Sequence, residues 1–143
     1  WTEKGPIVIR LYNNNPGFNI GVRIGTYLPG TSSVGKIFLA FQDEQRLKKW
    51  KEEEWGKLAP SEREELEKEI EQIRGKKIAF SHEPIVRSVS SIAFPVLNFQ
   101  GKIAAAVAVV GFKDQIPMDE NSELGQYILD ISKRISASLG YQM

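Results

Sequence analysis

The residues with the clearest chemical pattern lie between Gly30 and Lys36, where the sequence reads GTSSVGK. This spacing satisfies the G-x-x-x-x-G-K pattern of a phosphate-binding loop, in which backbone N–H groups hold phosphate oxygens and the lysine neutralises charge. Ile37, however, stands where such a loop needs a serine or threonine for magnesium, and Pro29 stands where a buried strand should lead into the loop. The sheet expected below is also antiparallel rather than parallel. The competing interpretation is a loop-to-helix junction in which glycine permits the turn.

The same junction has the character of an anion site even without a phosphate. If Ser32 or Ser33 caps a helix that starts here, unpaired N–H groups of the first turn point outward, and the positive end of the helix dipole suits a carboxylate. The two hydroxyls add hydrogen-bond donors. A capping role alone also explains both serines, so the residues leave a small anionic ligand and a purely structural cap as open alternatives.

No arrangement of residues predicts a catalytic site. A nucleophile elbow needs G-x-S-x-G, whereas Gly30, Ser32 and Gly35 are spaced one residue too widely. His82 is the only histidine and cysteine is absent, so we expect no metal site. The glutamates of the central charged segment are spaced as on a solvated helix face. We therefore expect neither an enzyme nor a cofactor.

Three serines interrupt a later apolar stretch, at Ser88, Ser90 and Ser91. A buried hydroxyl needs a hydrogen-bond partner, which a neighbouring strand, the backbone or a ligand can supply. Strand alternation places Ser90 and Ser91 on opposite faces. The following strand carries small residues on one face, namely Ala106, Ala108 and Val110. Such residues leave room for a ligand or for a packed helix.

Apolar patterns predict the elements that position these groups. The predicted strands are 6–12, 18–24, 77–81, 89–97 and 102–112, with a tight hairpin loop at 98–101. The predicted helices are 32–41, a charged helix from Asp43, a helix from a Ser61/Glu64 capping box to Gly75, and 120–139. The buried stripe of the last helix is predicted as Ile128, Ile131, Ile135 and Leu139. Because the hairpin loop is too short for a parallel crossover, we predict an antiparallel sheet with helices, an α+β fold.

Length and charge narrow the class further. The 143 residues suit one domain, and 19 Lys+Arg against 18 Asp+Glu give a net charge of +1 with both signs interleaved. This balance gives no support for direct DNA contact. The longest apolar run, 103–111, is too short to span a membrane, and no signal peptide is visible. With no cysteine, the composition suits the cytoplasm. Because the chain begins at Trp1, we expect a fragment or a processed product.

Two segments resemble the effector-binding domain of the IclR family of bacterial transcription regulators. VRIGTYLPGTSSVGKIFLAF, at 22–41, is similar to a signature with R-x-G, Leu-Pro, small residues, Gly-Lys and Leu-Ala. SSIAFPVLNFQGKIAAAVAVVG, at 90–111, is similar to a second signature with Ile-Ala-x-Pro-Val, a turn containing glycine, and a strand ending in glycine. The closing helix and IRG at 73–75 also fit. The resemblance covers nearly the whole chain.

The resemblance implies a GAF-like fold, a mostly antiparallel sheet flanked by helices, with a metabolite pocket between the sheet and the Gly30–Lys36 junction. The implied lining positions are Ile20, Leu28, Ser33, Val34, Ser81 or His82, Ser91, Ala108 and Val110. Ligands of the family are commonly small organic or aromatic acids. Ala108 and Val110 replace positions that are often serine, which favours a larger and more apolar acid. The stretch between Pro29 and Gly35 is one residue shorter than usual in the family.

The resemblance also implies a homodimer or tetramer and contact with DNA only through a winged helix-turn-helix module. We expect that module, a linker helix and a first strand to precede Trp1, so that 1–143 is a single, N-terminally truncated effector-binding domain. In that hypothesis ligand binding shifts the spacing of distant DNA-binding modules. The alternatives are a nucleotide-binding protein that uses Gly30–Lys36, and an oligomerisation module whose pocket has closed.

Overall fold

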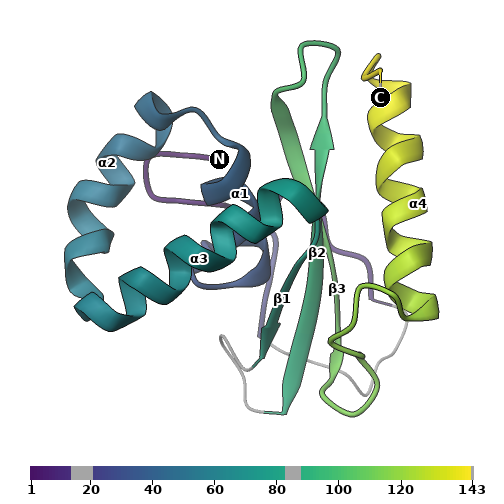
Figure 1. Cartoon of the computed structure of the whole chain (residues 1–143), viewed down its shortest axis with the longest axis horizontal. Helices are drawn as coiled ribbons and strands as arrows, with labels where there is room; N and C mark the ends of the chain where they lie inside the picture. The colour runs from purple at the N-terminus through teal and green to yellow at the C-terminus, as the bar shows by residue number, and fades with distance from the viewer. Residues whose placement is uncertain (14–20, 83–87, 143) are drawn as a thin grey trace.

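The computed structural model describes residues 1–13, 21–82 and 88–142 of the chain. Its regular elements follow one another as shown in Figure 1. In chain order they are α1 (Ser33–Phe41), α2 (Glu44–Glu54), the 3-10 turn η1 (Trp55–Lys57), α3 (Pro60–Lys76), β1 (Ala79–His82), β2 (Val89–Leu97), β3 (Ile103–Phe112) and α4 (Glu123–Ser138). None of the helices in the described ranges is both long and apolar enough to cross a membrane.

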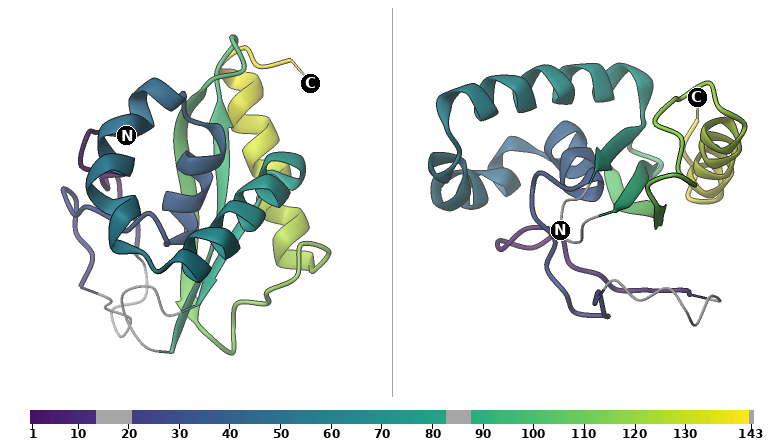
Figure 2. Two further views of the ribbon diagram at one scale, coloured as in Figure 1. Left: turned by 60° about the vertical axis from the view of Figure 1, so that its left-hand side comes forward. Right: turned by 90° about the horizontal axis from the view of Figure 1, so that it is seen from below.

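The strands form one antiparallel sheet in the order β1-β2-β3, with helices on both sides (Figures 1 and 2). All nine residues of β2 are buried, because this central strand is covered on both faces. The predicted α+β class and antiparallel sheet are therefore confirmed. Strand β2 follows its predicted bounds, and β1 and β3 differ from theirs by one or two residues, the usual uncertainty of an element's end.

Each face of the sheet has its own apolar core. On one face the side chains of α1, α2 and α3 pack with alternate residues of the strands, including Ile37, Leu47, Leu66, Ala79 and Ala93. On the other face Ile128 of α4 and Ile116 of the loop before it form a second core with Ile78, Ile92 and Phe94. Because successive strand residues point to opposite faces, the polar residues of β1 and β2 are also divided between the two layers.

The three tryptophans gather at the edge of the first core. Trp50 of α2 lies between Trp1 and Trp55, with ring centroids 6.1 and 6.4 Å away. The indole N–H of Trp1 donates to the carbonyl oxygen of Arg46 at 3.0 Å. Edge-on aromatic contacts of this kind fix the segment that precedes α1 against α2.

The structure corrects both predicted ends of α3. The helix begins at Pro60 with Ala59 as N-cap, so the predicted Ser61/Glu64 capping box is wrong. Proline suits the first helical position because its fixed φ is helical and its missing N–H would be unpaired there. The helix ends at Lys76 rather than Gly75, and Lys77 takes the left-handed conformation, with φ 60°.

The buried face of α4 also differs from the predicted isoleucine stripe. The helix is capped by Ser122 and buries Gly125, Ile128, Ser132 and Ser136. Ile135 and Leu139, which were predicted as buried, are 37% and 44% exposed. The difference arises from two hydrogen bonds between α4 and β2. The Ser132 hydroxyl donates to the carbonyl oxygen of Pro95 at 2.7 Å, and the Ser136 hydroxyl accepts from Leu97 N–H at 3.0 Å. These bonds rotate α4 so that its serines face β2.

The predicted strand at 6–12 does not form. Of the predicted strand at 18–24, only residues 21–24 are described, and these four residues belong to no sheet. Instead Ile7 and Tyr27 form an isolated bridge, next to hydrogen bonds from Val8 N–H to Thr26 and from Leu28 N–H to Pro6. Among the described residues these two segments pair without a third neighbour, so few backbone bonds hold them together. Ile9 and Tyr12 are accordingly 73% and 88% exposed.

Candidate functional site

The start of α1 lies directly over the sheet, and Ser32 rather than Ser33 caps it. The Ser32 hydroxyl accepts from Gly35 N–H at 3.0 Å and donates to the carbonyl oxygen of Pro29 at 2.6 Å. Since one serine satisfies the cap, Ser33 becomes the first residue of the helix and its hydroxyl faces another partner.

That partner is Ser91, in the middle strand of the sheet. The two hydroxyl oxygens are 2.6 Å apart, although 58 residues separate them in sequence. Ser33 is 1% exposed and Ser91 is 5% exposed. The bond therefore joins the first turn of α1 to the centre of the sheet inside the protein.

The strands bring two further predicted residues beside this pair. Ser81 of β1 and Val110 of β3 stand on either side of Ser91 in register, and residues paired in this way point to the same face. Ser81 is 6% exposed. Ala108 stands in the next row on the same face, paired with Ala93. The structure thus places these residues around the Ser33–Ser91 pair.

The remaining predicted positions lie at the margin of this group or outside the described residues. Val34 is partly buried and packs against the first core. Leu28 is half-buried in the segment that leads to α1, and its N–H donates to Pro6. Ile20 and the side chain of His82 lie outside the described residues. Ser90 is fully buried on the opposite face, and Ser88 is exposed.

The two glycines of the G-x-x-x-x-G-K pattern are required by packing. A Cβ atom on Gly30 would overlap with the indole ring of Trp50. A Cβ atom on Gly35 would overlap with the carbonyl oxygen of Pro29 and the backbone of Gly30. The close approach of α1 to the preceding loop and to α2 therefore accounts for both glycines.

The lysine of the pattern is also held by the protein. Lys36 donates to a carboxylate oxygen of Glu69 on α3 at 2.6 Å and to the carbonyl oxygen of Phe80 on β1 at 3.2 Å. Its side chain is 12% exposed. An ammonium group held in this way is not directed at the first turn of α1, which argues against a phosphate-binding loop. The sequence held no local signal for either contact, because 33 and 44 residues separate the partners.

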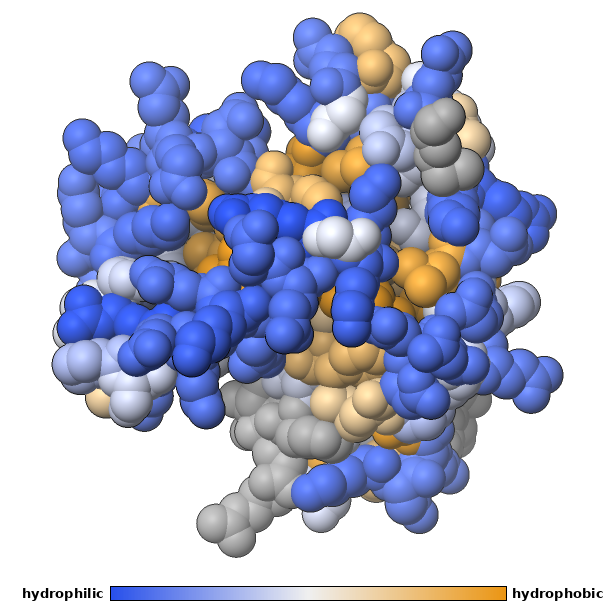
Figure 3. All heavy atoms as spheres, in the orientation of Figure 1, coloured by the Kyte–Doolittle hydropathy of each residue, from blue (hydrophilic) through white to orange (hydrophobic). Residues whose placement is uncertain are grey.

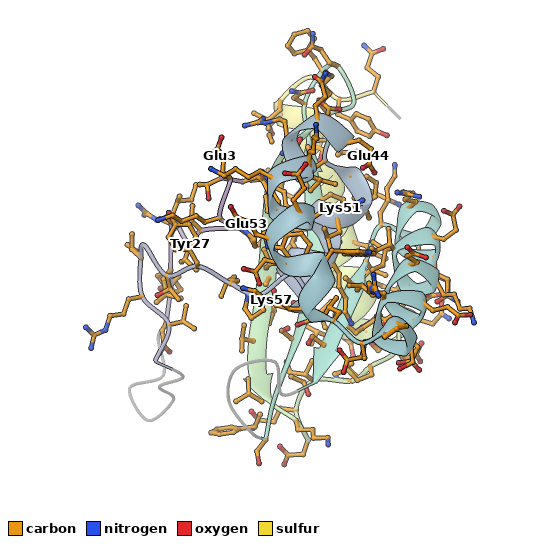
Figure 4. All side chains as sticks on the ribbon, turned by 90° about the vertical axis from the view of Figure 1, so that its left-hand side faces the viewer. Glu3, Tyr27, Glu44, Lys51, Glu53 and Lys57 are labelled. Carbon is orange, nitrogen blue, oxygen red and sulfur yellow. The ribbon has the colours of Figure 1, made fainter. Side chains whose placement is uncertain are left out.

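Most charged residues of α2 and α3 are exposed. Figure 4 shows Glu44 and Lys51 on α2 and Lys57 at the turn that follows it; Lys51 pairs with Glu44 at 3.2 Å. Figure 3 shows hydrophilic atoms covering both helices. Among the described residues no three acidic, histidine or cysteine side chains are grouped as metal ligands. The glutamates predicted as a solvated face occupy such a face.

Two of the open hollows on the described surface are lined by none of the predicted ligand-lining residues. One lies between the β2–β3 hairpin tip and the chain end, around Phe99, Gly101 and Tyr141. The other lies at the end of β3, around Ser88, Phe112 and Gln115. The polar group at Ser33 and Ser91 is thus internal to the described structure.

Several solved bacterial proteins share this fold. Pseudomonas aeruginosa HmgR superposes with a TM-score of 0.85 and 26% identity over 99% of this chain and 58% of that chain. The Agobacterium tumefaciens repressor BlcR superposes with a TM-score of 0.70 and 20% identity over 91% of this chain and 54% of that chain. The chain thus spans little more than half the length of either protein.

An inducer-binding domain gives a third comparison. This domain, from the PobR transcription factor of Acinetobacter, is a double mutant in complex with 3-hydroxybenzoic acid, and it superposes with a TM-score of 0.66 and 23% identity over 89% of this chain and 74% of that chain. A search of curated proteins found no match.

The family model for the bacterial transcriptional regulator IclR C-terminal domain matches residues 7–137. The chain belongs to this family, and it is an effector-binding domain of the IclR type.

Proposed function

We propose that this domain binds a small organic acid through the start of α1 and the serines of β1 and β2, and that binding controls the attachment of the whole regulator to DNA. The observation that carries the proposal is the buried Ser33–Ser91 hydroxyl pair, which joins the first turn of a helix to the middle of the sheet. Both residues belong to the ligand-lining positions that the sequence predicts.

The first turn of α1 supplies donors suited to a carboxylate. In the described part of the chain, no hydrogen bond reaches the backbone N–H groups of Ser33 and Val34, whereas that of Gly35 is taken by Ser32. The positive end of the helix dipole lies at the same place. A carboxylate there would accept bonds from fixed, neutral donors.

The serines supply the second part of the donor set. A pair of hydroxyls contains two hydrogens, and the bond between Ser33 and Ser91 uses one of them. Among the described residues, the Ser81 hydroxyl makes no hydrogen bond, although it stands in register with Ser91 and is almost fully buried. A ligand oxygen between them could accept from the remaining hydrogen of the pair and from the Ser81 hydroxyl.

The neighbouring side chains favour an acid with an apolar body. Ala108 and Val110, both half-buried, would contact the ligand without a hydroxyl of their own. Because Lys36 is bound to Glu69, the site offers neutral donors rather than a salt bridge. The complex of PobR with 3-hydroxybenzoic acid supports an aromatic acid as one class of candidate.

The rest of the regulatory mechanism belongs to the same proposal. The domain would act as a homodimer or tetramer in the cytoplasm, and the acid would favour one arrangement of subunits. DNA-binding modules linked to the domain would then change their spacing. The near-neutral net charge of +1 fits a domain that does not itself hold DNA.

The test is a thermal-shift assay of the purified chain with benzoate, 3-hydroxybenzoate, phenylacetate and hexanoate, and with ATP and magnesium in a separate arm. An acid present at a hundred times its dissociation constant adds about 2.7 kcal/mol to the free energy of unfolding. At roughly 3 °C per kcal/mol for a chain of this length, the melting temperature should rise by about 8 °C.

Two variants decide where the acid binds. Ser33→Ala should abolish the shift relative to its own ligand-free melting temperature, while Ser138→Ala, at an exposed position of α4, should retain it. No shift with any of the four acids would contradict binding of a simple organic acid and favour an oligomerisation module. A shift with ATP alone, lost in Lys36→Ala, would favour a phosphate site instead.

A further inference from the structure

Lys36 joins three elements at one point. It lies on α1, one turn after Ser33, and its ammonium group donates to Glu69 of α3 and to the carbonyl oxygen of Phe80 of β1. Figure 1 shows α3 crossing α1 beside this strand. The side chain is almost buried, whereas that of Glu69 is half-exposed, with 47% of its surface accessible. The carboxylate thus remains solvated while it fixes the ammonium group.

The strand that Lys36 contacts is short and lies at an edge of the sheet. β1 has four residues and, among the described residues, pairs with β2 alone. Phe80 lies directly before Ser81, and Ser81 stands in register with Ser91. An edge strand this short is restrained by few backbone bonds, so a charged donor on its carbonyl oxygen adds a strong further restraint.

We propose that Lys36 is a positioning residue, which ties β1 to α1 and so fixes Ser81 against the Ser33–Ser91 pair. The inference rests on the proposed function for its effect on ligand affinity, but the restraint on β1 belongs to the ligand-free protein. It also gives the lysine of the G-x-x-x-x-G-K pattern a role unrelated to phosphate. Glu69 holds the ammonium group in place, so α3 takes part in shaping the site.

The restraint on β1 is tested by amide hydrogen exchange without ligand. Lys36→Met keeps a chain of similar length and removes the donor. Exchange in the segment 79–82 should become faster by about tenfold, the effect expected for one lost hydrogen bond from a charged group. Exchange in β3 and α4 should not change. Lys68→Met is the matched control, because Lys68 and Glu64 both lie on α3 and form an exposed ion pair with each other.

The effect on affinity is measured with whichever of benzoate, 3-hydroxybenzoate, phenylacetate and hexanoate binds the parent chain most tightly. Titration calorimetry should give a dissociation constant about tenfold weaker in Lys36→Met and unchanged in Lys68→Met. Glu69→Gln keeps an acceptor for Lys36 but removes its charge, so we expect a smaller loss of affinity. It provides a second variant if Lys36→Met does not fold.

The outcomes separate this inference from the proposed function. If β1 exchange is the same in Lys36→Met and Lys68→Met, Lys36 does not position the strand and the inference is wrong. A lower melting temperature with uniformly faster exchange and unaltered affinity would show a general structural role and would also overturn it. If none of the four acids binds the parent chain, the acid-binding proposal fails, while faster exchange confined to β1 still supports the tie between Lys36 and the strand.

Discussion

Replacing Ser136 by alanine should destabilise the domain although it removes a single oxygen atom. The Ser136 hydroxyl accepts from Leu97 N–H at 3.0 Å, and both residues are buried. The register between β2 and β3 shifts between Val96 and Leu97, and β1 ends its pairing at Ala93. In the variant Leu97 N–H loses the acceptor that α4 supplies.

The magnitude follows from the cost of an unsatisfied buried donor. An orphaned backbone N–H costs about 1–3 kcal/mol, which at roughly 3 °C per kcal/mol lowers the melting temperature by about 3–9 °C. Chemical denaturation with urea, followed by circular dichroism, should give the same loss without a change in the slope of free energy against urea concentration.

Ser138→Ala is the matched control for this measurement. Ser138 lies on the same helix, is exposed, and donates to the carbonyl oxygen of Arg134 in its own helix at 3.0 Å. Its replacement should leave stability within about 0.5 kcal/mol of the parent chain. Equal stability of the two variants would refute the reasoning, because α4 would then not be seated on β2 by its serines.

Two further predictions concern the junction before α1 and the surface. Gly30→Ala should lower the melting temperature by about 3–9 °C, because the new Cβ would overlap with Trp50 and an overpacked core costs about 1–3 kcal/mol. Gly75→Ala, with open space around it, should be neutral or stabilising. Equal effects of the two substitutions would contradict the packing of Gly30 against Trp50. The hydrogen bond from Lys49, together with its charge, lowers the pKa of the Glu3 carboxyl. The stabilisation from this pair is thus present above the unfolded-state pKa of Glu3 and is lost as the pH falls through the lower folded-state pKa. An NMR titration should find the pKa of Glu3 raised in Lys49→Met and in 1 M salt, because exposed charges are screened; an unchanged value would disprove the pairing.

The sequence predicts the sheet well because its signals are local. Strand β2 and the hairpin after it follow from a run of apolar residues and a tight turn, in which Gly101 has φ 74°. The start of α1 also follows, since Ser32 caps it as one of the two candidate residues. The placement of Ser81 and Ser91 on one face follows from strand alternation once their antiparallel pairing is known.

The errors arise where tertiary contacts decide. Helical periodicity alone made Ile135 and Leu139 core residues, but hydrogen bonds from β2 turn Ser132 and Ser136 inward instead. Ladder bonds from a third strand would be needed to make a regular strand of 6–12, and local propensity cannot supply them.

The candidate site shows the same division. Its serines were predicted, but the hydroxyl pair and the contacts of Lys36 join residues that are tens of positions apart. No local pattern encodes such contacts, so the motif offers for Lys36 only a phosphate-binding alternative, against which Ile37 and Pro29 already argue. The position of Ile20 relative to the other lining residues stays a prediction, because it lies outside the described part of the chain.

The intrinsic fluorescence of the tryptophan cluster, Trp1, Trp50 and Trp55, reports on one part of the domain. All three tryptophans of the chain belong to it, and the ring of Trp50 lies under Gly30, three residues before Ser33. Ultraviolet emission excited at the red edge of the absorption band therefore arises beside the start of α1 and not from β3 or α4. Small displacements of the loop before α1 change the polarity around an indole ring, whereas changes at α4 leave the emission spectrum unchanged. The wavelength of the emission maximum thus reports on movement of this loop without an attached dye.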